Sequence, residues 1–116
     1  MDRPDRDIVR RKAAQVFPGH DPADIVAILD RYGVESWERE RERVQLALLR
    51  ISEGSLERLL QWLGYAKTDY RDALAAAEYP SESRAGFTGM GKLSPAQREA
   101  IRRKDREAYR AWLEGA

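Results

Sequence analysis

Apolar residues recur every three or four positions along most of the chain, which is the spacing of an amphipathic α-helix. Five segments carry this pattern: residues 5–16, 22–32, 37–53, 56–78 and 95–114. The strict alternation of apolar and polar residues that is typical of β-strands is missing, and β-branched residues are few. The pattern therefore predicts an all-α fold, a compact bundle of five or six helices.

Residues with strong positional preferences separate these segments. Ser36 and Ser55 are expected to cap the 37–53 and 56–78 helices, because a serine side chain accepts a hydrogen bond from a free amide in the first turn. Ser94, followed by a proline and a glutamine, gives the same signal for the last helix. Pro80 ends the helix before it. The 56–78 segment either runs as one helix or restarts near Thr68.

The composition divides the chain into three parts. Residues 1–80 are expected to form a helical core domain. Residues 81–93, "SESRAGFTGMGKL", contain three glycines and no periodic pattern, which predicts a flexible linker. Residues 94–116 are expected to form a basic amphipathic helix that packs on the core or on a partner.

Two internal segments show how the helices are expected to pack. The 37–53 segment is charged in its first half and apolar on several sides in its second half, "VQLALLRI", so it is expected to enter the centre of the bundle. In "TDYRDALAAAEYP", Ala73 and Ala77 share one helix face with Tyr70. Small residues allow a close approach between helices, so this face is interpreted as a packing surface. Asp69 and Asp72 are interpreted as its solvated edge.

The run "YGVESWERERERVQLALLRISEG", followed by "LERL" and "AKTDYRDALAAAEYP", resembles a group of small uncharacterised bacterial helical proteins. The resemblance covers residues from about 28 to 80. It implies a helical fold in a bacterial protein, and it implies no activity, cofactor or catalytic residue.

Composition and charge narrow the class of protein. A length of 116 residues suits a single domain. The absence of cysteine excludes disulfides, thiolate nucleophiles and cysteine-ligated metal sites. Neither a membrane-spanning apolar stretch nor a signal peptide is found, so a cytoplasmic protein without a membrane span is expected.

The net charge is +1, but its distribution along the chain is uneven. Residues 1–12 and 92–116 are basic while the middle is acidic, which favours attraction between the ends and an acidic surface.

The sequence gives only weak signals for catalysis or for metal and phosphate binding. Asp69 and Asp72 share a helix face, but a carboxylate-bridged metal centre requires histidines on facing helices, and His20 is the only histidine. A magnesium site of carboxylates alone is left open, and it would need a substrate phosphate as a further ligand. The segment from Gly86 to Lys92 has the glycine spacing of a phosphate loop, but Leu93 replaces the Ser or Thr that would hold magnesium. No catalytic residue, cofactor or metal ligand is therefore predicted, and the protein is not expected to be an enzyme.

The favoured hypothesis is a non-enzymatic helical protein–protein interaction module that self-associates as a homo-oligomer or binds another helical protein. The alternative is a nucleic-acid-associated accessory protein that uses the basic C-terminal helix, although four interleaved acids weaken that helix as a phosphate-binding surface. The interaction candidates are two aromatic residues outside the main apolar stripe, two on the apolar side of the last helix, and four arginines of that helix: Trp62, Tyr65, Tyr109, Trp112, Arg102, Arg103, Arg106 and Arg110.

Overall fold

The computed structural model describes residues 5–115 and is all-α over that range. The helices in chain order are α1 (Arg6–Val16), α2 (Pro22–Leu29), α3 (Arg41–Ser52), α4 (Leu56–Thr68), α5 (Tyr70–Glu78), α6 (Pro80–Gly91) and α7 (Pro95–Glu114). Gly86 has a φ of 70° and interrupts α6, so dividing that helix gives eight. The predicted fold class is confirmed, whereas the predicted number of helices was too low.

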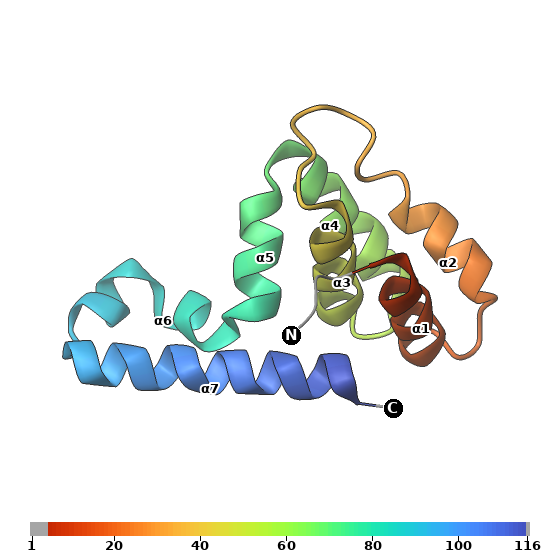
Figure 1. Ribbon diagram of the computed structural model, residues 1–116. Helices are drawn as coiled ribbons and strands as arrows, with labels where there is room; N and C mark the ends of the chain where they lie inside the picture. Colours follow the sequence, from red (N-terminus) through yellow and green to blue (C-terminus); the bar gives the residue numbers. More distant parts are fainter. Residues whose placement is uncertain (1–4, 116) are drawn as a thin grey trace.

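Helix α3 lies at the centre of the bundle, with α1, α4 and α5 around it and α2 against α1 (Figure 1). Its sequence is apolar on several sides, and most of its side chains are accordingly buried: Val44, Gln45, Leu46, Ala47, Leu48, Leu49, Ile51 and Ser52. The expectation that this segment enters the centre of the bundle is confirmed.

Helix α5 packs against α3 and α4 through its small residues. Ala73 and Ala77 are almost completely buried, as the interpretation of this face as a packing surface requires. Asp69 caps the helix, because its side chain accepts a hydrogen bond from the amide of Arg71 and also binds the Arg71 guanidinium at 2.9 Å. The helix therefore restarts at Tyr70, and Asp69 has a structural role at its start.

The predicted start of the third helix was wrong. Ser36 is not its cap, and residues 37–40 lie outside it, because α3 begins at Arg41. Glu40 has a φ of 56°, a left-handed conformation that a continuous right-handed helix cannot contain. The carboxylate of Glu38 also accepts hydrogen bonds from the backbone of the preceding loop, which holds this stretch in a non-helical conformation.

Residues 81–93 were predicted to form a linker without regular secondary structure, and this was also wrong, because residues 80–91 form the helix α6. Pro80 occupies the first turn, where a proline costs no hydrogen bond. The cap comes from α7: the buried carboxylate of Asp105 accepts hydrogen bonds from the amides of Ser81 and Glu82, at 3.1 and 3.3 Å. This capping residue lies more than twenty positions away, so local sequence does not reveal it.

Helix α7 packs back on its own chain. It starts with the predicted capping box between Ser94 and Gln97. In Figure 1 it runs beneath α6 and α5, and its C-terminal end reaches α1. There, Arg11 donates a hydrogen bond to the carbonyl of Leu113 at 2.9 Å, and Lys12 donates one to the carbonyl of Trp112. Cations at the C-terminal end of a helix are stabilising.

Candidate functional site

The aromatic residues predicted on the last helix lie on its inner face. Tyr109 and Trp112 pack against the core with ring centroids 5.7 Å apart. The Arg50 guanidinium lies 5.2 Å from the centre of the Tyr109 ring, and the Lys12 ammonium lies 4.4 Å from that of Trp112. Burial, with Glu78 nearby, raises the pKa of Tyr109, so this phenol stays neutral. Both rings therefore help to hold α7 on the core.

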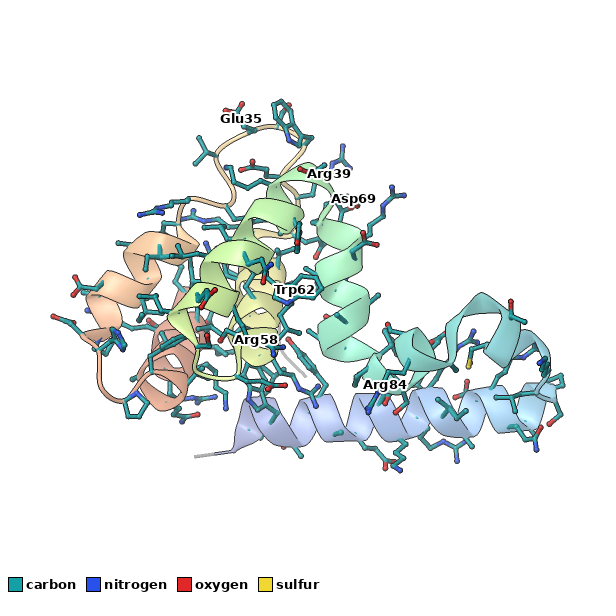
Figure 2. All side chains as sticks on the ribbon, turned by 180° about the vertical axis from the view of Figure 1, so that it is seen from behind. Glu35, Arg39, Arg58, Trp62, Asp69 and Arg84 are labelled. Carbon is teal, nitrogen blue, oxygen red and sulfur yellow. The ribbon has the colours of Figure 1, made fainter. Side chains whose placement is uncertain are left out.

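The two aromatic residues predicted on α4 differ in exposure. Trp62 and Tyr65 form an edge-to-face pair with ring centroids 5.7 Å apart. Trp62 is half-buried against the core, and Figure 2 shows it between α4 and α5. Tyr65 is 55% exposed. Of the four predicted aromatic residues, Tyr65 is the one that presents most of its surface to solvent.

The arginines predicted on α7 are largely neutralised by carboxylates of the same chain. Three of the four are paired: Arg102 with Glu82 at 3.0 Å, Arg106 with Glu99 at 2.8 Å and Arg110 with Glu114 at 3.7 Å. Arg103 makes no ion pair within residues 5–115. The helix is thus less available for nucleic-acid phosphates than its composition suggests, and the nucleic-acid alternative stays a prediction.

A more exposed aromatic residue lies on the loop between α2 and α3. Trp37 is 60% exposed and Val34 on the same loop is 72% exposed. Beside Trp37 lies a hollow of about 600 Å³ between this loop and the junction of α4 and α5. We call the hollow and its lining the Trp37 surface: Ser36, Trp37, Arg39, Ala66, Thr68, Asp69, Tyr70 and Arg71.

The conformation of the loop is fixed by one buried carboxylate. The side chain of Glu38 is 1% exposed, and its Oε1 accepts hydrogen bonds from the amides of Gly33 and Val34 at 3.0 and 3.1 Å. Its Oε2 accepts one from the Lys67 ammonium at 2.9 Å. Burial acts to raise the pKa of Glu38, but the hydrogen bonds from Lys67 and the backbone outweigh it and hold the pKa below its ordinary value.

Further hydrogen bonds tie the loop to α4 and to itself. The Trp37 indole donates to the carbonyl of Lys67 at 3.2 Å, and the Lys67 ammonium donates to the carbonyl of Arg31 at 2.6 Å. The Tyr32 hydroxyl, on a fully buried side chain, donates to the carbonyl of Arg39 at 2.6 Å. The Trp37 side chain is thus exposed, while hydrogen bonds to α4 and within the loop hold the backbone that carries it.

The Trp37 surface carries charges of both signs. Figure 2 shows Glu35, Arg39 and Asp69 at the same end of the molecule, whereas Arg84 lies at the end formed by α6 and α7. Arg39 and Arg71 supply positive charge to the lining, and Asp69 supplies negative charge. A surface that carries both positive and negative side chains can pair its charges with those of an identical surface on a second copy.

The described residues offer little for metal or acid–base chemistry. No group of three or more histidine, cysteine or acidic side chains within residues 5–115 is arranged to hold a metal ion. His20 lies in the turn after α1, edge-on to Phe17 with ring centroids 5.7 Å apart. Asp72 is exposed on the first turn of α5. That the protein is not an enzyme remains a prediction.

Comparison of the chain with protein-family models, with curated proteins and with solved structures gives no match. The resemblance of residues 28–80 to small bacterial helical proteins therefore stays a prediction. In the part of the chain that the structure describes, no helix combines the length and the apolar character needed to cross a membrane.

Trp37 was missed as a site residue because the sequence was interpreted as helical from this position. The signal available was local. Val34 and Trp37 lie outside every helical stripe, and an acid, Glu38, follows a glycine turn at a distance that lets its side chain reach the free amides of that turn. Apolar residues on a loop that is pinned in this way are candidates for a contact surface.

Proposed function

We propose that this protein is a helical protein–protein interaction module that self-associates through the Trp37 surface. The observation that carries the proposal is an indole that is 60% exposed, held by a buried carboxylate network, beside a hollow of about 600 Å³. The proposal keeps the predicted class of function and moves its site from candidates on α4 and the last helix to the loop between α2 and α3.

An exposed tryptophan on a fixed backbone suits an interface. Tryptophan is enriched among the few residues that supply most of the binding free energy at protein interfaces, with truncation costing about 2 kcal/mol or more. An ordered loop also loses little conformational freedom on binding, which lowers the cost of association. The hydrogen bonds of Glu38 already order the loop in the single chain, before a partner binds.

The adjacency of a projecting ring and a hollow favours a second copy of the chain as the partner. A two-fold dimer uses the same patch on both subunits, so the patch must complement itself. On the Trp37 surface, the ring of each copy would enter the hollow of the other. Asp69 and Arg71 already pair within each chain at 2.9 Å, so Arg39 of one copy would meet the carboxylate of a neutralised pair on the other and no like charges would be forced together.

Sedimentation equilibrium of the full chain from micromolar to millimolar concentration tests the proposal. We expect the wild type to form a dimer. Trp37→Ala should weaken the dimer about a thousandfold, because each dimer loses two rings worth about 2 kcal/mol apiece. Tyr65→Ala is the matched control, since it removes an exposed aromatic ring outside the hollow and should leave the dimer intact.

Helicity measured by circular dichroism should be the same in all three proteins, because both side chains are mostly exposed. A wild type that stays monomeric over the whole range would overturn the proposal. Equal weakening by both substitutions would remove the Trp37 surface as the interface.

A further inference from the structure

A second hollow, of about 480 Å³, lies between the C-terminal turn of α5 and the middle of α7. Its volume falls within the range of small-molecule sites. We call it the α5–α7 hollow, and its lining mixes aromatic rings with charged groups: Glu78, Tyr79, Arg103, Arg106, Glu107, Tyr109 and Arg110. It shares no lining residue with the Trp37 surface.

Positive charge predominates in the α5–α7 hollow. Arg103, Arg106 and Arg110 follow one another at helical spacing, so one flank of α7 presents three guanidinium groups to it. Arg103 has no ion pair in the described part of the chain, and Arg110 has only a distant one, at 3.7 Å. These two groups are the most available to an added anion.

The inner carboxylate of the hollow is already neutralised. Arg43 of α3 donates two hydrogen bonds to Glu78, from Nε at 2.8 Å and from a terminal nitrogen at 2.6 Å. Such a bidentate pair is geometrically well defined and leaves little negative charge to repel an anion. Glu107 is then the carboxylate of the lining that opposes the three arginines.

The aromatic part of the lining adds a second kind of contact. Tyr79 lies between α5 and α6, Tyr109 lies on α7, and both give the hollow apolar wall area. The hydroxyl oxygen of Tyr109 is buried and finds no hydrogen-bond partner among the described residues. A buried hydroxyl without a partner is rare and calls for an explanation.

We propose that the α5–α7 hollow binds a small organic anion, a flat apolar body that carries one phosphate or carboxylate group. Arg103 and Arg110 bind the anionic group, and the two tyrosines contact the apolar body. The Tyr109 hydroxyl supplies a further donor once the lining adjusts to the ligand. This site is independent of self-association through the Trp37 surface.

Fluorescence titration of the full chain with 1-anilinonaphthalene-8-sulfonate tests the site. The sulfonate of this probe stands in for the anionic group, and its rings stand in for the apolar body. We expect binding at one site per chain. The double substitution Arg103→Ala with Arg110→Ala should weaken it about tenfold or more, since two charge-assisted contacts are lost.

The matched control is Lys92→Ala with Lys104→Ala, which removes the same charge from exposed positions outside the hollow. It should leave the affinity within about twofold, as screened charges at a distance act weakly. Equal weakening in the two double variants, or no binding by the wild type, would overturn the proposal.

Competition then identifies the anionic group. Phenyl phosphate and benzoate share an aromatic ring, and displacement of the probe by either one supports the site and names the preferred group. Benzyl alcohol has the ring without the charge and should not displace the probe. Displacement by benzyl alcohol as readily as by the anions would contradict a site built on guanidinium groups.

Discussion

Two ends of the molecule use the same kind of anchor and place their tryptophans differently. At one end, Glu38 is buried and accepts hydrogen bonds from loop amides, and Trp37 beside it projects into solvent. At the other, Asp105 of α7 is buried and accepts hydrogen bonds from the first amides of α6, and Trp112, further along α7 where it meets α1, lies against the core. Each acid fixes a backbone, but only one end keeps its aromatic ring exposed.

The difference comes from the basic residues nearby. Lys12 donates to the carbonyl of Trp112 and lies over its ring, so the ring is enclosed between α7 and α1. Lys67 instead donates to Glu38 and to a loop carbonyl, which leaves the face of Trp37 uncovered. A cation from the same chain therefore covers Trp112, whereas Trp37 stays 60% exposed.

Replacing each tryptophan separately should break this comparison most clearly. Trp112→Ala removes a ring packed on the core and should lower the free energy of unfolding by about 3 kcal/mol. Trp37→Ala removes a mostly exposed ring and should lower it by less than about 1 kcal/mol. Urea unfolding followed by circular dichroism at low protein concentration measures both, and equal losses would show that exposure does not separate the two residues.

Replacing Asp105, the buried acid that caps α6, extends the comparison of the two ends. Asp105→Ala leaves the amides of Ser81 and Glu82 without their acceptor, so we expect a loss of about 2 kcal/mol in the free energy of unfolding. Asp72→Ala is the control, since Asp72 is exposed on the first turn of α5 and should cost about 0.5 kcal/mol.

Amide hydrogen exchange adds a local measurement to the same pair of variants. Faster exchange at residues 81 and 82 should appear in the Asp105 variant alone. Unchanged exchange there would mean that α6 does not need its cap from α7.

The sequence was sufficient in several places where the cause of a structure is local. The apolar stripes predicted the all-α fold, and Ser55 and Ser94 cap the helices that they were expected to cap. The buried alanines of α5 followed from their spacing. In each case the residues that determine the structure lie within a few positions of one another.

Structure that depends on distant residues was not predicted. The cap of α6 comes from Asp105, and the loop that holds Trp37 depends on Lys67, which lies on α4. The helix of residues 80–91 was not predicted, because these residues have no periodic pattern and their cap comes from α7. The candidate site was missed for a further reason: residues 37–40 were interpreted as helical, although the local contact of Glu38 with Gly33 and Val34 holds them outside α3.

Acid titration tests the role of Glu38 beside Trp37, and its expected effect is the smallest of those predicted. The pKa of Glu38 is held below its ordinary value of 4.5 in the folded state, so the unfolded chain binds the proton more readily. The stabilisation from Glu38 is therefore present above about pH 4.5 and is lost as the pH falls through the folded-state pKa.

Glu38→Gln cannot take up that proton, so its free energy of unfolding should fall less steeply below about pH 4.5 than that of the wild type. At pH 7 the substitution should cost about 1 kcal/mol, because the charge-assisted bond from Lys67 becomes a neutral one. Asp30, whose pKa is lowered chiefly by its hydrogen bond from Arg6, gives both proteins the same acid loss, so the difference between the two slopes reports Glu38 alone. If the slopes coincide, the carboxylate does not hold the loop, and the exposed position of Trp37 needs another cause.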